Sequence, residues 1–173
     1  MKKIILLLFI FLTACAGIPE GIKPITNFDV NRYIGVWYEI ARLDNRFERG
    51  LNQISAEYRL RDDGGLTVIN SGYNIESGKR EYAEGKAYFT GNPDVGSLKV
   101  SFFGPFYGGY HIIELDRENY SYVMIAGSDR DYLWILSRTP KLDDMVLKNL
   151  TAKAKTLGFK TDKLIFSEQL PAN

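Results

Sequence analysis

The sequence predicts an all-β protein: an eight-stranded antiparallel up-and-down β-barrel, with one C-terminal α-helix packed outside it and a short final strand. Two observations lead to this prediction. Between residues 37 and 138, eight segments with strand character follow one another and are joined by turn-like connections. The only segment with helical spacing comes after them, and one more strand-like segment follows it. Eight strands close into a barrel just wide enough to hold one small ligand.

Each predicted strand is short and bounded by turn-forming residues. The second shows the clearest alternation, because Ile54, Ala56 and Tyr58 share one face while polar or charged residues occupy the other. Connections such as DDGG at 62–65 are rich in Gly and Asp, which favour tight turns. The eight predicted strands cover residues 37–43, 53–61, 66–74, 80–90, 97–103, 110–116, 121–127 and 132–138.

The predicted helix lies between Asp143 and Gly158. Apolar residues from Val146 to Leu157 recur with a 3.6-residue period, and lysines lie mostly opposite. Aspartates at the start and lysines near the end suit the helix dipole, and Gly158 can end the helix. The last predicted strand follows within residues 162–169.

The first fifteen residues, MKKIILLLFIFLTAC, have the organisation of an export signal. Two lysines precede an apolar run, Ile4 to Leu12, that is too short to span a bilayer. The final LTAC resembles the lipobox of bacterial lipoproteins, which implies cleavage before Cys15 and lipidation of that cysteine; an ordinary secreted protein with a free thiol is the alternative. Ala16 after the cysteine favours the outer membrane. We therefore expect a signal peptide (1–14), a lipidated tether (15–26) and a barrel domain (27–173).

The composition argues against several classes of function. The formal net charge is +1 and no basic cluster follows the signal, so no nucleic-acid partner is expected. His111 is the single histidine, and Cys15 is the single cysteine. Neither a second histidine nor a free thiol is left for common nucleophilic catalysis, and no nucleophile-elbow, zincin or phosphate-loop motif occurs. We expect no enzyme activity, no metal and no cofactor.

Three motifs in order carry a resemblance to a known family. The stretch GVWY at 35–38, the stretch ELDRENY at 114–120 and the stretch WILSRTP at 134–140 resemble the three signatures of the lipocalin family, although the second keeps only its aspartate, Asp116. The likeness runs from about residue 27 to 169 and is greatest to the outer-membrane lipoprotein branch of bacteria. It implies a ligand-binding barrel and a role in envelope maintenance under stress.

The first and third motifs predict a closed barrel end. An indole covered by a guanidinium can plug such an end through a cation–π contact, which indicates Trp37 and Arg138. Gly35 gives the backbone freedom where that plug needs room. Glu39 shares the inward face of Trp37, and so does Ala41, whereas Tyr38 and Ile40 point outward. The predicted floor of the barrel is therefore Gly35, Trp37, Glu39 and Arg138.

Glu39 is the exception on an apolar face. A buried carboxylate without a partner is costly, so we expect it to be hydrogen-bonded, ion-paired or protonated. Arg138, Tyr132 or a water molecule are the candidate partners. A structural network near the barrel floor is favoured over a catalytic acid.

The same alternation predicts an apolar, aromatic-lined interior that suits an elongated acyl chain. Residues toward the open end are the better candidates for ligand contact, and those near Trp37 are expected to fill the barrel. The predicted wall residues are Tyr58, Val68, Asn70, Phe89, Val100, Phe102, Tyr110, Ile112, Val123, Ile125, Tyr132 and Trp134.

The loop after the first strand is predicted to lie over the barrel mouth. Phe47 can close over a ligand, and Arg46 or Arg49 can meet a phosphate or carboxylate headgroup; a solvated charged loop is an equal alternative. The aromatic turn FFGPFYGGY (102–110) suits ligand entry, membrane contact or a partner subunit. A homodimer through the open-end loops remains an alternative.

Together these features predict a lipid-anchored outer-membrane carrier, on the periplasmic face, that binds fatty acids or lysophospholipids. Two alternatives remain at this point. An esterase-like lipid-modifying enzyme would depend on His111, which the alternation places outside the barrel. An envelope-interaction lipoprotein would have a barrel filled by its own side chains.

Overall fold

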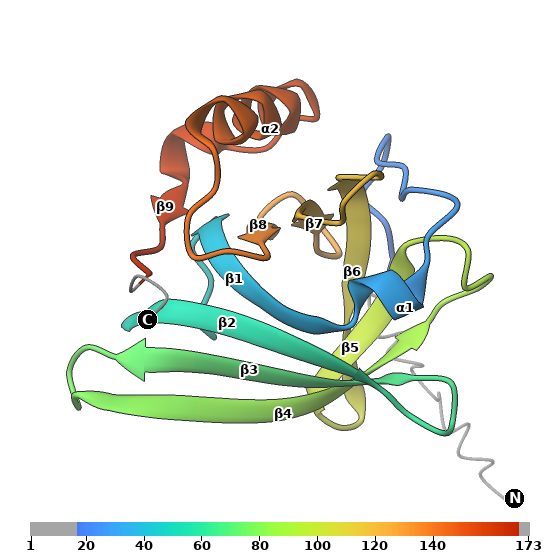
Figure 1. Ribbon diagram of the computed structural model, residues 1–173, viewed down its shortest axis with the longest axis horizontal. Helices are drawn as coiled ribbons and strands as arrows, with labels where there is room; N and C mark the ends of the chain where they lie inside the picture. Colours follow the sequence, from blue (N-terminus) through green and yellow to red (C-terminus); the bar gives the residue numbers. More distant parts are fainter. Residues whose placement is uncertain (1–16, 170–173) are drawn as a thin grey trace, which may run out of the picture.

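The protein folds as a closed antiparallel barrel, as its sequence predicts. The computed structural model describes residues 17–169. Strands β2, β3 and β4 run side by side across the lower part of Figure 1, and the helix α2 (Asp144–Thr156) lies on the far side of β1. The strands are β1 (Gly35–Arg42), β2 (Leu51–Leu60), β3 (Leu66–Asn74), β4 (Lys79–Phe89), β5 (Ser97–Phe103), β6 (Phe106–Leu115), β7 (Tyr122–Ala126) and β8 (Leu133–Ser137).

The barrel closes through β1, which pairs with β8 on one side and with β2 on the other. Every neighbouring pair is antiparallel, so alternate connections lie at opposite ends. The connections β2–β3, β4–β5 and β6–β7 share the end at which β1 begins, which we call the closed end. The connections β1–β2, β3–β4, β5–β6 and β7–β8 share the other, which we call the open end. A short strand, β9 (Ile165–Phe166), pairs outside the barrel with β1.

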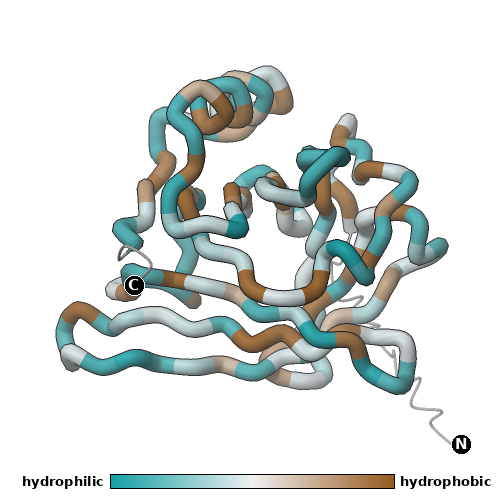
Figure 2. The backbone as a smooth tube through the Cα atoms, in the orientation of Figure 1, coloured by the Kyte–Doolittle hydropathy of each residue, from teal (hydrophilic) through white to brown (hydrophobic). Residues whose placement is uncertain are grey.

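Two separate hydrophobic clusters result from the alternation of side chains across the strands. The inner cluster includes Trp37, Leu66 and Ile112. The outer cluster packs Leu150 and other residues of the helix α2 (Asp144–Thr156) against the outside of the barrel. Hydrophobic and hydrophilic residues are interspersed along the whole traced chain (Figure 2). No helix between residues 17 and 169 combines the length and the apolar character that crossing a bilayer requires.

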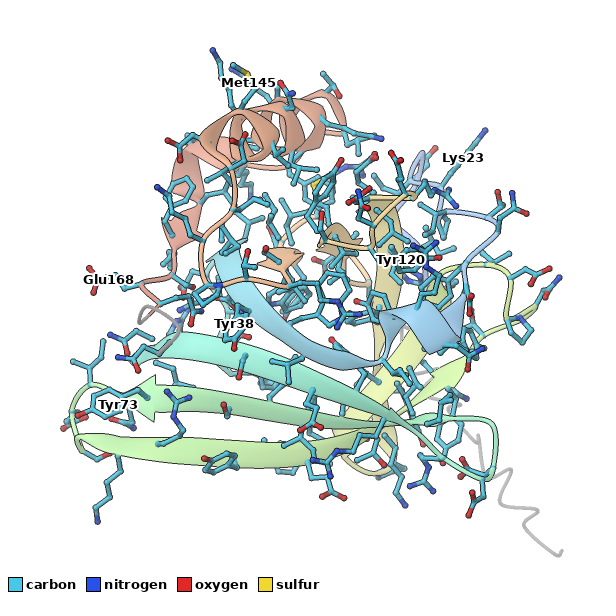
Figure 3. All side chains as sticks on the ribbon, in the orientation of Figure 1. Lys23, Tyr38, Tyr73, Tyr120, Met145 and Glu168 are labelled. Atoms are coloured by element: carbon cyan, nitrogen blue, oxygen red, sulfur yellow. The ribbon has the colours of Figure 1, made fainter. Side chains whose placement is uncertain are left out.

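Helix α2 begins and ends much as predicted. The side chain of Asp143 accepts hydrogen bonds from Met145 N and Val146 N, which satisfies two free N–H groups of the first turn. Gly158, with φ +86°, follows the last turn. Met145 projects away from the barrel (Figure 3).

One prediction of side-chain direction in β1 is wrong, because the strand contains a β-bulge. Glu39 pairs with Leu136 and Ala41 pairs with Ile135, so Ile40 is the extra residue. A bulge shifts the alternation by one position. Ala41 therefore lies in the outer cluster and not in the interior. Arg42, which pairs with Trp134, faces inward instead.

The described part of the segment before β1 packs on the barrel, where the sequence predicted a tether over residues 15–26. Cys15 itself and the signal peptide lie outside the described residues. From Gly17 onward the chain packs along the barrel, and Ile22 and Ile25 are buried. A short helix, α1 (Val30–Tyr33), then covers the closed end. Turn-forming Gly and Pro residues suggested a linker, but backbone hydrogen bonds to β6 and to the β4–β5 loop hold the segment in place.

Candidate ligand-binding site

The closed end is built around Trp37 and Arg138. The Arg138 guanidinium lies over the Trp37 ring, 3.9 Å from its centroid. It also donates hydrogen bonds to the carbonyl oxygens of residues 32, 33, 34 and 36 at 2.7–3.0 Å. Gly35 has φ +98°, and a Cβ there would lie 3.3 Å from Arg138 Nη1. The first and third sequence motifs thus meet and tie α1 to the barrel.

Three tyrosines form a polar layer above this plug. The hydroxyl of Tyr110 lies 2.5 Å from that of Tyr33 and 2.8 Å from that of Tyr58. Burial raises the pKa of Tyr33 and Tyr110 well above the usual value and that of Tyr58 to about 12, so all three stay neutral. Tyr33 lies on α1, which the alternation analysis did not include. The three hydroxyls form hydrogen bonds with one another, so their burial does not require a water molecule or a ligand as a partner.

The interior changes character on either side of this tyrosine layer. Toward the closed end, inward side chains are buried and pack against one another. Toward the open end they face inward but are only half-buried. Of the predicted wall, Tyr58, Val68, Ile112, Val123 and Ile125 belong to the packed part. Asn70, Val100, Phe102 and Trp134 are the half-buried ones, and Tyr110 belongs to the tyrosine layer itself.

Phe89 is a predicted wall residue that lies elsewhere. It ends β4 at the closed end, and its ring lies 6.2 Å from that of Phe28. Its inward direction is as predicted, but its position along the strand removes it from the open half. Tyr132, just before β8, stacks on Trp134 with the ring centroids 6.0 Å apart.

Arg42 is the partner of Glu39. Arg42 Nη1 donates to Glu39 Oε1 at 2.7 Å, and Ser167 Oγ donates to the same oxygen. Both charged side chains are at most 5% exposed. Arg138, one of the expected partners, is held at the closed end. The bulge explains the difference, since residues three apart in a regular strand face opposite sides.

The lid loop, which we define as residues 43–50, is joined to this pair. Trp134 Nε1 donates to Glu48 Oε2 at 3.0 Å, and Asn45 Nδ2 donates to the same oxygen. Arg42 Nη2 donates to the backbone oxygen of Glu48 at 3.1 Å. The lid is therefore tied to the interior wall by a charged network that the sequence pattern did not reveal.

Two carboxylates share one guanidinium in this network, which affects the protonation of Glu39. Burial, followed by the nearby Glu48 carboxylate, raises the pKa of Glu39 to about 7, although Arg42 and Ser167 act in the opposite direction. Glu39 Oε2 and Arg42 Nε are buried without a hydrogen-bond partner. The C-terminal segment adds to the site, because Gln169 Nε2 donates to the carbonyl oxygens of Glu39 and Ile54 at 2.8 Å.

The rim of the open end is apolar. Phe47 on the lid is exposed, with the Arg46 guanidinium 4.9 Å from its ring centroid. Arg49, the other candidate for a headgroup contact, already pairs with Asp44 at 2.7 Å. Phe103 and Phe106 flank the β5–β6 turn and are both exposed. Of the two predicted lid arginines, Arg49 is ion-paired and Arg46 lies over the Phe47 ring.

His111 lies away from the interior. Its Nδ1 is 3.0 Å from Ser97 Oγ, and its Nε2 is 3.1 Å from the carbonyl oxygen of Gly17. The ring is fully buried beneath the N-terminal segment. This histidine therefore holds the segment on the outside of the barrel.

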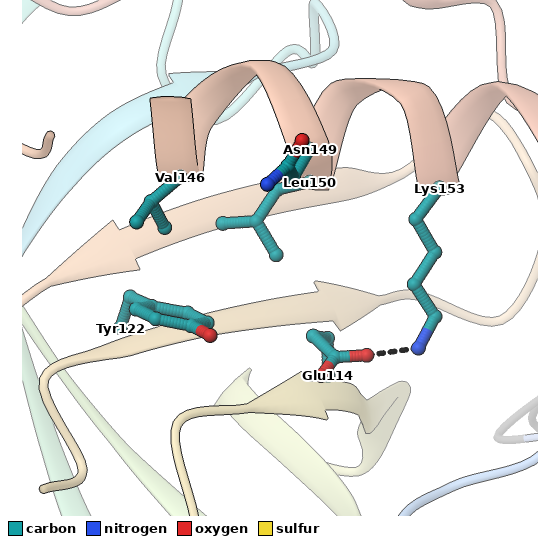
Figure 4. A pocket seen from close by; sticks show the side chains of 6 residues that line it. All are labelled: Glu114, Tyr122, Val146, Asn149, Leu150 and Lys153. Atoms are coloured by element: carbon teal, nitrogen blue, oxygen red, sulfur yellow. Dashed lines mark hydrogen bonds and ion pairs between the residues drawn. The ribbon is translucent and has the colours of Figure 1, made fainter. Parts of the chain in front are cut away.

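A groove lies outside the barrel, between α2 and strands β6 and β7. This groove of about 290 Å³ is lined by Glu114, Tyr122, Val146, Asn149, Leu150 and Lys153. An ion pair between Lys153 Nζ and Glu114 Oε2 spans it (Figure 4). Because Leu150 is buried in the outer cluster, the groove forms the edge of the helix–barrel contact and does not reach the interior.

Comparisons with known proteins agree with this architecture. The family model described as a lipocalin-like domain matches residues 28–169. An outer membrane lipoprotein Blc of Vibrio cholerae is 52% identical and covers 98% of this chain and 99% of its own. The protein of that name from Escherichia coli K12 is 58% identical over 87% of this chain and 85% of its own.

More distant relatives and solved structures extend the comparison. Bovine apolipoprotein D is 31% identical and covers 83% of this chain and 78% of its own. The cockroach allergen Per a 4 has a TM-score of 0.69 at 19% identity, covering 90% of this chain and 96% of its own. Insecticyanin of the tobacco hornworm Manduca sexta has a TM-score of 0.69 at 23% identity, with 89% and 87% coverage. These two structures share the fold.

Proposed function

Because the chain belongs to the lipocalin-like family, whose members are binding proteins and not enzymes, we propose that it carries a single fatty acid or lysophospholipid in its barrel. The observation that supports this most is the half-buried wall above the tyrosine layer. Aliphatic and aromatic side chains there face inward yet remain in contact with solvent, which an acyl chain would displace.

The proposal extends to the place of action. Relatives at 52–58% identity are named outer membrane lipoproteins, and the LTAC sequence is suited to lipidation at Cys15. We infer that the mature protein is anchored in the outer membrane with its barrel on the periplasmic side. There it would bind lipids released during envelope stress, without any covalent step.

A titration tests the carrier function. Protein stripped of bound lipid is titrated with oleate or with lysophosphatidylethanolamine, and the stoichiometry is read by native mass spectrometry. Trp134 lies in the half-buried wall, whereas Trp37 is fully buried at the closed end. We therefore expect a saturable change in tryptophan emission and one bound lipid per barrel.

A matched pair of variants localises the binding. Val100→Glu places a charge on the inner wall, and Lys99→Glu places the same charge on the neighbouring, outward position of β5. We expect at least tenfold weaker lipid binding for Val100→Glu and unchanged binding for Lys99→Glu. Absence of binding by the unmodified protein would instead favour a barrel filled by its own side chains.

A further inference from the structure

The N-terminal segment runs along the barrel from its closed end toward its open end. Near the closed end, Phe28 N donates to Asp94 O in the β4–β5 connection at 2.9 Å. Further along, Ile25 N donates to Ile112 O at 2.9 Å. Arg130, in the β7–β8 connection at the open end, donates to the carbonyl oxygen of Glu20 at 2.6 Å.

Gly17 is the last described point on this path, and it lies beside the middle of β6. Its carbonyl oxygen is 3.1 Å from His111 Nε2 and would lie 3.2 Å from a Cβ on Gly109. Phe106, where β6 begins, is three residues from Gly109, or about 10 Å along a strand. Cys15 is two residues from Gly17, and an extended chain of that length spans about 7 Å at most. A lipid on Cys15 is therefore held within reach of the middle of β6, about 10 Å along that strand from Phe106.

Exposed apolar side chains gather at the open end. Phe103 and Phe106 are each 73% exposed, Ile75 in the β3–β4 turn is 62% exposed, and Phe47 on the lid is 59% exposed. These four, which we call the rim residues, come from three separate connections of the open end. Large exposed apolar groups at one end of a barrel indicate a contact with a partner or a membrane. Phe106 lies about 10 Å along β6 from Gly109, the neighbour of Gly17, and this closeness to the anchoring cysteine favours the membrane.

We propose that the open end of the barrel faces the bilayer, with Phe103 and Phe106 in its interfacial region. This orientation rests on the proposed lipidation of Cys15. The lipid on Cys15 would hold the chain at the membrane, and aromatic side chains at the interface add an attachment that sets the orientation of the barrel. A lipid leaving the bilayer would then enter the barrel without crossing bulk water. The surface that recognises the membrane is thus the rim itself.

Depth-dependent quenching tests the orientation. The lipidated protein is reconstituted in phosphatidylethanolamine–phosphatidylglycerol vesicles whose acyl chains carry bromine, which quenches indole emission on contact. Phe106→Trp places an indole on the rim. Leu60→Trp is the matched control, because Leu60 is 48% exposed at the closed end. The emission of the parent protein in the same vesicles is subtracted from both.

We expect the indole introduced at position 106 to lose at least half of its emission, and the one at position 60 to keep nearly all of it. Equal quenching at both positions, or stronger quenching at position 60, overturns the orientation. Failure of the lipidated protein to co-sediment with vesicles overturns the anchor and hence the proposed location as well. A blue shift at position 106 that grows with protein concentration without vesicles would assign the rim to a second copy of the chain, which also overturns the proposal.

Discussion

Glu39 and Arg42 are three residues apart on one strand, yet they form a buried ion pair of 2.7 Å on the same side of the barrel wall. The bulge at Ile40 makes this possible. Glu48 shares the guanidinium and brings the lid loop into the same network. The pair therefore links the interior wall, the lid and, through Ser167, the C-terminal segment.

Removing Arg42 should destabilise the fold strongly. Arg42→Met keeps a flexible apolar side chain but leaves the buried Glu39 carboxylate and the partly buried Glu48 carboxylate without their cation, and such a loss costs about 3–5 kcal/mol. Urea unfolding followed by circular dichroism measures the effect. Arg59→Met, which breaks the exposed pair with Glu57, is the control and should leave the midpoint nearly unchanged. Similar midpoints for both variants would contradict this view of the network.

The stability of the protein should depend on the protonation of Glu39. Its pKa rises from 4.5 to about 7 on folding, so the folded state binds more protons between these values. The stabilisation that comes from this proton uptake is complete below about pH 4.5. It is lost as the pH rises through about 7, which lowers the free energy of unfolding by up to about 3 kcal/mol. Glu39→Gln should remove it.

The measurement compares the free energy of unfolding of the parent and Glu39→Gln at pH 4.5, 6 and 8. The parent should lose stability relative to the variant as the pH rises. Glu57→Gln serves as the control, because Arg59 lowers the pKa of Glu57 and so its titration falls below this window. If the free energies of unfolding of the parent and Glu39→Gln change in parallel with pH, Glu39 does not titrate between pH 4.5 and 8.

The contact between Gly35 and Arg138 should make Gly35→Ala more harmful than an ordinary glycine replacement. Both Gly35 and Gly64 have positive φ, but a Cβ on Gly64 meets nothing within 4 Å. Gly64→Ala therefore reports the backbone strain alone, about 1 kcal/mol. Gly35→Ala should cost about 1 kcal/mol more, because the added Cβ forces Arg138 to shift over Trp37. Equal midpoints in thermal unfolding would contradict this.

Glu48 should control the opening of the lid. Glu48→Ala removes the acceptor for Trp134 Nε1 and Asn45 Nδ2, so the loop should open more often. We expect at least fivefold faster hydrogen exchange of the Leu51 amide, which donates to Glu48 O, and faster release of a bound lipid. Asp44→Ala, which breaks the exposed pair with Arg49, is the control and should exchange like the parent.

The sequence by itself determined the barrel and its closed end. Strand alternation and turn residues follow from local chemistry, so eight strands and one helix could be located without coordinates. The pairing of Trp37 with Arg138, 101 positions away, was predictable because both belong to recognisable motifs. The inward direction of most wall residues followed from the period of two.

Tertiary structure decided where the alternation of inward and outward side chains is interrupted along β1. Nothing local marks Ile40 as an extra residue, since the bulge arises from the register between β1 and β8. The bulge turns Ala41 outward and Arg42 inward. Because Arg42 faces inward, it becomes the partner of Glu39. The tyrosine layer and the path of residues 17–28 likewise depend on contacts between segments far apart in the chain. Such contacts follow from how the closed barrel packs, which a period along one strand does not encode.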